Sequence, residues 1–339
     1  MPAVLQQASV FKVIHSASRT CSGMGVPCAA YKEGLIMTNV TTVLTAQRHG
    51  GPEVLEFLTQ PAPRPAQGEV LIRVRAAGIN PIDARRMTGE FGQVLPQHFG
   101  TEFAGVIEQL GEGVSGWQMG DEVLGSGAGF THASYILVPA TNLVAKPASL
   151  SWEVAGSLAG VSQTASTILR ELALSAPASL LIHGGAGGVG SIAIQLAKQQ
   201  GLTVVATASA ANQDYLRELG AIAVVYGEGL IERIRAVHPE SFDAAVDMAG
   251  TAEAIEASLQ LVKADGHIGT IAGKPVNSPR VQPMWVKRNP ADLRRVADGV
   301  ADGSLSWVVS RTYPFTEARA AYGDILDGHT RGKSVLLFD

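Results

Sequence analysis

The chain of 339 residues has few of the groups on which several classes of protein depend. Its only two cysteines, Cys21 and Cys28, exclude a disulfide framework and indicate a reducing compartment. Charged residues make up 17%, and no cluster of Lys and Arg offers the charge that nucleic-acid binding needs. An uninterrupted apolar run of about 18 residues, as a membrane-spanning helix requires, is also missing. With 46% hydrophobic residues and a net charge of -4, the composition indicates a compact globular protein of the cytoplasm.

Residues 1–36 differ from the rest of the chain. The segment contains three basic residues, Lys12, Arg19 and Lys32, only one acidic residue, Glu33, and several Ser and Ala residues. This composition has a faint likeness to an organelle transit peptide, which would direct the protein to an organelle instead of the cytoplasm. We favour the alternative that Met37 is the natural start. Under either interpretation we expect residues 1–36 to be a poorly ordered extension.

Residues 37–157 have the pattern of short strands separated by turns. EVLIRVRAAGI, at 69–79, alternates apolar and polar residues, which predicts a half-buried strand. The prolines of PAPRP just before it exclude a helix, because each removes a hydrogen-bond donor. We therefore expect a β-rich domain with a barrel-like meander.

From residue 158 to residue 306, strands and helices alternate. SLLIHG, TVVATA and AVVY are typical of strands, whereas VGSIAIQLAKQQG and NQDYLRELG are typical of helices that end on glycine. This order predicts a parallel sheet with helices on both faces. Residues 307–339 contain strands like those of the first domain, so we expect the chain to return there. The expected fold class is α/β, with a doubly wound Rossmann domain inserted in a β-rich domain.

One glycine-rich stretch, HGGAGGVGSIAIQ at 183–195, follows a predicted strand and opens a predicted helix. Gly185, Gly187 and Gly190 have the G-x-G-x-x-G spacing of dinucleotide-binding turns. The first permits a tight turn, the second lets the backbone approach a pyrophosphate, and the third lets the helix lie against the strand. The helix N-terminus then offers unpaired amides to the phosphates. We expect this turn to bind a dinucleotide.

The end of the following strand bears on which dinucleotide is used. A site for NAD has Asp or Glu there to bind the ribose hydroxyls, but this chain has Thr207, Ala208 and Ser209. A carboxylate would repel the 2′-phosphate of NADPH, so its absence favours NADPH over NADH. Ser209 and Asn212 could donate hydrogen bonds, although no Arg follows the strand.

Four motifs together resemble a known family. AAGINPIDARRMTG, FGTEFAGVIEQLGEGVSGWQMGDEVLG, HGGAGGVGSIAIQLAK and VVATASAANQDYLRELGA occur in this order. They resemble the zinc-free quinone oxidoreductase (zeta-crystallin-like) branch of the medium-chain dehydrogenase/reductase superfamily, from about Thr42 to Asp339. The resemblance implies a GroES-like domain interrupted by a Rossmann domain. Asn80 and Thr101 stand where zinc-dependent members have Cys and His, and amide and hydroxyl are poor zinc ligands, so no metal is expected.

The resemblance also implies site residues. Asn80 and Arg85 would be catalytic, with Asn80 lining the pocket of nicotinamide and substrate. The implied cofactor-binding residues are Asn80, Ser162, Gly185, Gly187, Gly188, Val189, Gly190, Thr207, Ala208, Ser209, Asn212, Asp247, Ala249, Gly250, Ile271, Ala272 and Gly273. His183, at a strand end, is expected to be a packed or solvent-facing imidazole and not a catalyst.

These observations predict transfer of hydride from NADPH to a quinone or an α,β-unsaturated carbonyl. Asn80, Arg85 or a cofactor hydroxyl would stabilise charge on the acceptor oxygen, and solvent would deliver the final proton. Two alternatives stay open: a non-catalytic NADPH-binding protein and an enoyl-thioester reductase of the same fold. A serine hydrolase at Ser157 is disfavoured, because AGSLAG lacks both outer glycines of the nucleophile elbow. Family analogy adds a homodimer.

Overall fold

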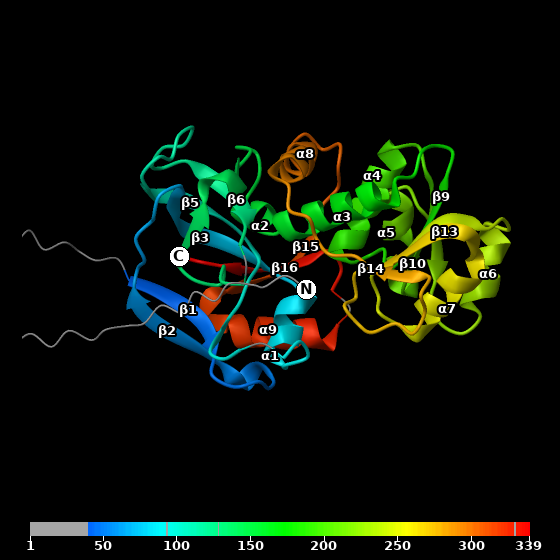
Figure 1. Ribbon diagram of the computed structural model, residues 1–339, viewed down its shortest axis with the longest axis horizontal. Helices are drawn as coiled ribbons and strands as arrows, with labels where there is room; N and C mark the ends of the chain where they lie inside the picture. Colours follow the sequence, from blue (N-terminus) through cyan, green and yellow to red (C-terminus); the bar gives the residue numbers. More distant parts are fainter. Residues whose placement is uncertain (1–39, 93, 128, 329) are drawn as a thin grey trace, which may run out of the picture. The chain divides into compact units, whose positions relative to one another are not determined.

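The computed structural model describes residues 40–92, 94–127, 129–328 and 330–339 (Figure 1). What we expect of residues 1–36 concerns a segment outside these ranges. The described residues belong to one compact unit. Among their helices, none has the length and apolar character needed to cross a membrane.

The β-rich part of the chain folds into two sheets. Its strands are β1 (Val40–Ala46), β2 (Leu55–Pro61), β3 (Glu69–Ile79), β4 (Gln97–His98), β5 (Glu102–Leu110), β6 (Glu122–Ser126), β7 (Tyr135–Pro139) and β8 (Leu143–Ala145). Within the described ranges, β2, β1 and β4 form one sheet, and β3, β5, β6 and β8 follow one another in a larger antiparallel sheet. A short helix, α1 (Pro81–Met87), follows β3 and begins on a proline, whose fixed φ suits the first helical position.

Strand β3 follows the predicted alternation only around Arg73 and Arg75, since Val70, Leu71 and Ile72 are all buried. Arg73 and Arg75 are half-buried between buried neighbours, as the pattern predicts, but the strand is buried on both faces from Ala76 to Ile79. The reason is the short helix α2 (Trp152–Ala155), whose last turn lies on this part of the strand. The amide of Gly78 donates to the carbonyl of Gly156 at 2.8 Å.

The nucleotide-binding part is a parallel sheet. Its strands are β9 (Ser179–His183), β10 (Thr203–Ala208), β11 (Ile222–Val225), β12 (Phe242–Asp247), β13 (Val262–Thr270) and β14 (Val281–Pro283). Its helices are α3 (Ala159–Leu172), α4 (Gly188–Gln199), α5 (Gln213–Glu218), α6 (Leu230–Val237) and α7 (Ala252–Leu261). Within the described residues the strand order is β11-β10-β9-β12-β13-β14, with all neighbours parallel. The order reverses between β9 and β12, which is where ligands bind in doubly wound sheets.

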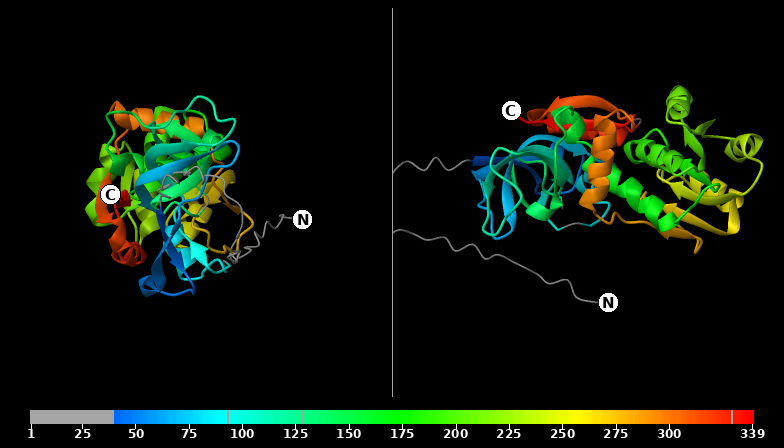
Figure 2. Two further views of the ribbon diagram at one scale, coloured as in Figure 1. Left: turned by 90° about the vertical axis from the view of Figure 1, so that its left-hand side faces the viewer. Right: turned by 90° about the horizontal axis from the view of Figure 1, so that it is seen from above.

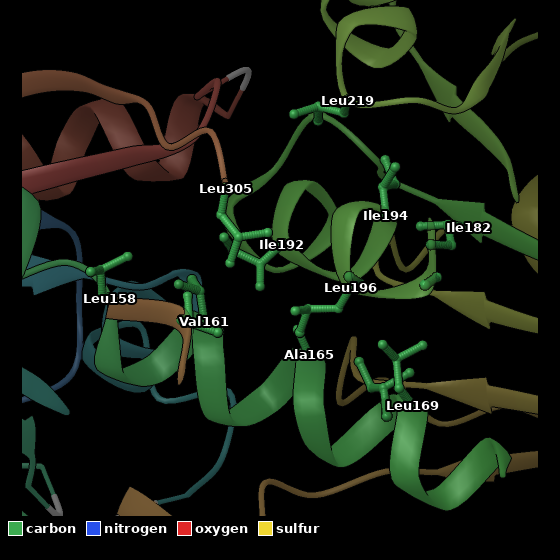
Figure 3. Close-up of a cluster of buried hydrophobic side chains, with 14 of the residues drawn as sticks. Leu158, Val161, Ala165, Leu169, Ile182, Ile192, Ile194, Leu196, Leu219 and Leu305 are labelled. Carbon is green, nitrogen blue, oxygen red and sulfur yellow. The ribbon is translucent and has the colours of Figure 1, made fainter. Parts of the chain in front are cut away.

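Each central strand is buried on both faces. Leu180 and Ile182 of β9 pack in one cluster with residues of α3 and α4, which Figure 3 shows around Ile192 and Leu196. Leu181, between them, points to the opposite cluster with residues of α6 and α7. Continuous apolar strands such as SLLI follow from this double covering.

The chain then returns to the β-rich part. Its last elements are α8 (Pro290–Ala301), β15 (Val309–Pro314), α9 (Ala318–Asp327) and β16 (Lys333–Leu337). Helix α8 packs beside α3 (Figures 1 and 2), and β16 pairs with the second half of β3, with Ser334 opposite Ile79. The predicted fold class, a Rossmann sheet inserted in a GroES-like domain, is therefore confirmed. The boundaries after residues 157 and 306 stay a prediction.

Candidate active site

The glycine-rich stretch forms the turn between β9 and α4. A Cβ on Gly190 would lie 2.5 Å from the carbonyl oxygen of Gly184, so only glycine lets the helix lie this close to the turn. The first bond of the helix joins the Ser191 amide to the Gly187 carbonyl at 2.9 Å. The preceding amides of α4 therefore lie before the first helical hydrogen bond, in half-exposed backbone at Gly188 and Val189. These amides fit a pyrophosphate group, as the spacing predicts.

A polar cluster lies just beyond the end of β10. Thr207 and Ala208 are buried, whereas Ser209 and Asn212 are half-buried. The Asn212 side-chain amide donates to Ser209 Oγ at 3.0 Å. The Nε of Arg331 donates to Asn212 Oδ1 at 2.7 Å. A guanidinium therefore joins the two residues that we expected beside the adenosine ribose.

Arg331 is held there by the backbone of the next residue, Gly332. The amide of Gly332 donates to the carbonyl of Ala186 at 3.1 Å, and Gly332 forms a parallel bridge with Gly187. The Arg331 guanidinium also lies over the ring of Tyr215, 5.4 Å from the ring centroid. Ser209, Asn212 and Arg331 together fit a phosphate on the ribose, because a guanidinium and polar donors suit that group.

The ends of β12 and β13 are joined through Asp247. Its Oδ1 accepts the amides of Ala249 and Gly250 at 2.9 Å each, and its Oδ2 accepts the Thr270 hydroxyl at 3.0 Å. The Asp247 carboxylate is 1% exposed, so it shapes the turn and does not face a ligand. Exposed or half-buried positions at the same edge of the sheet are Ala249, Gly250, Ile271, Ala272 and Gly273.

Asn80 lies at the start of α1 with all its polar side-chain atoms bonded. Its Nδ2 donates to Thr101 Oγ1 at 3.1 Å and to Glu102 Oε1 at 2.9 Å, and its Oδ1 accepts from the Lys333 ammonium at 2.7 Å. An ammonium group only donates, so Lys333 fixes which end of the amide carries oxygen. Both N–H bonds of Asn80 are thereby directed at Thr101 and Glu102.

Lys333 and Glu102 form a buried ion pair beneath Asn80. Their side chains are 4% and 0% exposed, and the ammonium contacts Glu102 Oε1 directly. The other carboxylate oxygen accepts the Gly160 amide at 2.6 Å, in the first turn of α3. The pair therefore joins three parts of the fold: β5, the start of β16 and the first turn of α3.

Comparisons with known proteins agree with this geometry. Residues 66–148 match the family model of the alcohol dehydrogenase GroES-like domain, and residues 219–336 match that of zinc-binding dehydrogenases. The chain is 30% identical over 306 residues to the chloroplastic NADPH-dependent alkenal/one oxidoreductase of Arabidopsis thaliana, covering 85% of this chain and 77% of that protein. Quinone oxidoreductase of Escherichia coli, solved in complex with NADPH, has a TM-score of 0.80 at 26% identity and covers 87% of this chain and 99% of its own. CurK enoyl reductase has a TM-score of 0.80 at 27% identity, with coverages of 88% and 99%.

The chain belongs to the medium-chain dehydrogenase/reductase superfamily. It falls in the quinone oxidoreductase branch, as its motifs led us to expect.

The residues at the family's zinc position do not fit a zinc ion. Asn80 and Thr101 offer an amide and a hydroxyl, which bind zinc poorly. The carboxylate of Glu102 is already paired with the Lys333 ammonium, whose charge would repel a dication. The proposed hydride transfer uses no metal.

Arg85 is engaged in two contacts. Its Nε and Nη2 donate to the two carboxylate oxygens of Glu90, at 2.5 and 2.7 Å, and its Nη1 donates to the carbonyl of Ala272. Arg85 therefore connects α1 to the turn after β13. Its hydrogen-bond donors are directed at protein groups, which makes it a positioning residue in this arrangement.

Ser162 and Thr164 lie on different faces of α3. Ser162 is 0% exposed, and its hydroxyl donates to the Leu158 carbonyl within the helix. Gly160 faces the Asn80 cluster, since a Cβ there would lie 3.1 Å from Glu102 Oε2. Thr164, one turn after Gly160 and half-buried, shares that face. The Thr164 hydroxyl donates to the Gly160 carbonyl at 2.7 Å, so both hydroxyls are bonded within the helix, and Thr164 is the more exposed of the two.

His183 is a packed side chain, which is one of the two surroundings that we expected. It is 1% exposed, and its Nδ1 lies 3.2 Å from Thr207 Oγ1. Burial lowers the pKa of His183 from 6.5 to about 4, so the imidazole is neutral at physiological pH.

Proposed function

We propose that the chain is an NADPH-dependent oxidoreductase that reduces a quinone or an α,β-unsaturated carbonyl without a metal. The observation that carries this proposal is the segment from Arg331 to Lys333. It brings a guanidinium to Ser209 and Asn212 at the ribose end, and an ammonium to Asn80 at the other end. Its Gly332 lies against the glycine-rich turn between them.

The ribose end selects the cofactor. The helix amides of Gly188 and Val189 bind the pyrophosphate. Ser209, Asn212 and Arg331 bind the 2′-phosphate through hydrogen bonds and opposite charge. Since Thr207, Ala208 and Ser209 contain no carboxylate, nothing in this turn repels that phosphate. When bound, NADPH supplies the hydride, so that a conjugated acceptor gains one hydride and one proton and NADP+ is left.

The Asn80 end receives the acceptor. Both side-chain N–H bonds of Asn80 are directed at Thr101 and Glu102, so Asn80 acts as a positioning residue. Thr101 accepts the Asn80 hydrogen bond, and its own hydroxyl proton has no acceptor among the described residues. We propose that this hydroxyl donates a hydrogen bond to the carbonyl oxygen of the substrate that accepts the hydride, where negative charge develops. Thr164 replaces Ser162 as the hydroxyl of α3 near the cofactor.

The test is oxidation of NADPH with a panel of acceptors. We expect turnover with quinones and with enones such as methyl vinyl ketone, and little turnover with saturated ketones, because conjugation spreads the developing charge. Thr101→Val should lower kcat by about 10-fold, with Thr101→Ser near wild type. An absence of NADPH oxidation across the whole panel would contradict the proposal and leave a non-catalytic NADPH-binding protein.

An enoyl-thioester reductase is a second candidate, because the fold is similar to that of CurK enoyl reductase. Both candidates use the same site and differ only in the acceptor. Comparing kcat/KM for crotonyl N-acetylcysteamine thioester and methyl vinyl ketone distinguishes them.

We further propose a cytoplasmic homodimer. Strand β14 is the last strand in its sheet, and Trp285 beside it is 61% exposed. An open strand edge next to an exposed aromatic side chain suits pairing with a second copy. Light scattering during gel filtration measures the mass, and a fluorescent fusion reports the location.

A further inference from the structure

Two arginines from different elements lie near Gly127 and Gly129, in the part of the chain that follows β6. Arg288, before α8, donates from Nη2 to the carbonyl of Gly127 at 2.8 Å. Arg86, on α1, reaches the same segment, since a Cβ on Gly129 would lie 3.1 Å from its Nη1. The amide of Gly127 in turn donates to the carbonyl of Thr101 at 3.0 Å. Both guanidinium groups therefore lie close to Gly127 or Gly129, and the Gly127 backbone is bonded to the backbone of Thr101, the residue to which we assign the acceptor's oxygen.

Neither arginine has an acidic partner within the described ranges. The buried Nε of Arg86 has no hydrogen-bond acceptor there at all. Asp83, on the same helix, accepts the backbone amides of Asn80 and Gly100. The neighbouring Arg85 differs in having an acidic partner, because it donates hydrogen bonds to both carboxylate oxygens of Glu90.

The two positive charges also affect each other. The pKa of Arg288 is lowered, first by partial burial of its guanidinium and second by the positive charge of Arg86. Two like charges held together, with no carboxylate of the described residues in ion-pair contact, raise the free energy of the unliganded protein, and an oxyanion bound between them would lower it. Arginine is also the side chain best suited to bind carboxylate or phosphate in two-bond geometry.

We propose that Arg86 and Arg288 bind an anionic group of the acceptor, so that the substrate is a conjugated carbonyl compound carrying a carboxylate or a phosphate. This inference rests on the proposed reductase function and adds the substrate class to it. The acceptor's oxygen lies at Thr101 and its anionic group lies at the arginine pair.

The experiment compares charged acceptors with neutral analogues. One pair is β-acetylacrylate and its methyl ester, and the other is crotonyl-coenzyme A and crotonyl N-acetylcysteamine thioester. We expect kcat/KM of the wild type to favour the charged member of at least one pair by 10-fold or more, about the effect of one charge-assisted hydrogen bond. A preference in the first pair assigns a carboxylate, and a preference in the second assigns a phosphate.

The variants Arg86→Gln and Arg288→Gln should remove that preference, mainly through KM, and leave the neutral analogues within about two-fold. Arg86→Lys keeps the charge and should retain part of the preference. Arg294→Gln, on the exposed side of α8, removes the same charge elsewhere and should change nothing. Calorimetric titration of the NADP+-loaded protein with levulinate and methyl levulinate gives a readout without turnover, and levulinate should bind more tightly.

Equal kcat/KM within both pairs, together with equal binding of levulinate and its ester, would overturn the inference. Variants that lower kcat/KM equally for charged and neutral acceptors would overturn it as well. Variants that raise only the KM for NADPH would also overturn it, because they would assign the arginines to the cofactor. If neither the charged nor the neutral acceptors are reduced, the reductase function itself is wrong, and the levulinate titration still decides whether the arginines bind an anion.

Discussion

Arg331 and Lys333 are separated by one residue and have opposite surroundings. Arg331 is exposed and donates to Asn212 at the ribose end. Lys333 is 3% exposed and holds Asn80 and Glu102 at the other end. Gly332 separates them with φ +64, and a Cβ there would lie 2.2 Å from the Val308 carbonyl oxygen, so only glycine fits.

The difference shows how one short segment performs two tasks. The contacts of an exposed guanidinium contribute little to stability, so Arg331 can exchange them for a ligand group at little cost. A buried ammonium is costly to leave unpaired, so it holds its partners in one arrangement. Arg331 should therefore affect cofactor choice, and Lys333 should affect stability and the geometry of Asn80.

The largest expected effect is that of Lys333→Met. The variant leaves the buried Glu102 carboxylate without its partner, so the free energy of unfolding should fall by about 3–5 kcal/mol in urea denaturation. Lys263→Met is the matched control. Its pair with Asp243 has a lysine side chain 49% exposed, so its loss should lower the free energy of unfolding far less than the loss of Lys333.

The double variant Lys333→Met with Glu102→Gln sharpens this test. Removing both charges should recover part of the loss, because no unpaired charge is then buried. Equal unfolding free energies for Lys333→Met and wild type would show that Glu102 is not held by Lys333.

A smaller effect is expected from the buried His183, through pH. The unfolded chain binds a proton at His183 below its ordinary pKa of 6.5, whereas the folded protein does so only below about 4. The free energy of unfolding should therefore fall as the pH is lowered from 6.5 to 4, by about 3 kcal/mol from this group. His183→Asn should flatten that part of the curve, measured by urea denaturation at several pH values. An unchanged slope would contradict the assignment.

Much of the fold could be predicted because its signals are local. The alternation of strands and helices after residue 158 predicts the parallel sheet, and G-x-G-x-x-G predicts the turn at Gly187. One boundary has no local signal. The apolar pattern of α7 runs on into Val262, but the residues from Val262 begin β13, because Val262 pairs with Phe242. Apolar segments of this length fit a helix or a buried strand equally well.

Less of the site could be predicted, because it is made of contacts between distant residues. Arg331 meets Asn212, and Lys333 meets Asn80, only after β16 has paired with β3. No local pattern marks either residue as functional. The orientation of Ser162 and Thr164 likewise depends on which face of α3 meets Glu102. The roles assigned to all these residues stay predictions.

The third prediction concerns Arg331→Gln. It should raise the Kd of NADPH by about 10- to 100-fold, the effect of one or two charge-assisted hydrogen bonds, and leave that of NADH within about two-fold. Fluorescence titration with each dinucleotide measures both constants. Arg217→Gln, in the exposed pair with Asp214 on α5, removes the same charge close by and should affect neither. Equal weakening of NADPH and NADH would place Arg331 elsewhere on the cofactor.

The smallest effect is expected from Arg85→Gln, which tests whether an exposed contact at the Asn80 end acts like Arg331 or like Lys333. Its pair with Glu90 is partly exposed, at 21% and 42%, so the loss of stability should stay below about 1 kcal/mol. The contact with the Ala272 carbonyl would be lost as well, which frees the turn after β13 from α1. We therefore expect kcat/KM for methyl vinyl ketone to fall by a few-fold at most, roughly one lost hydrogen bond. A fall of about 1,000-fold would instead make Arg85 a catalytic residue that leaves Glu90 when substrate binds.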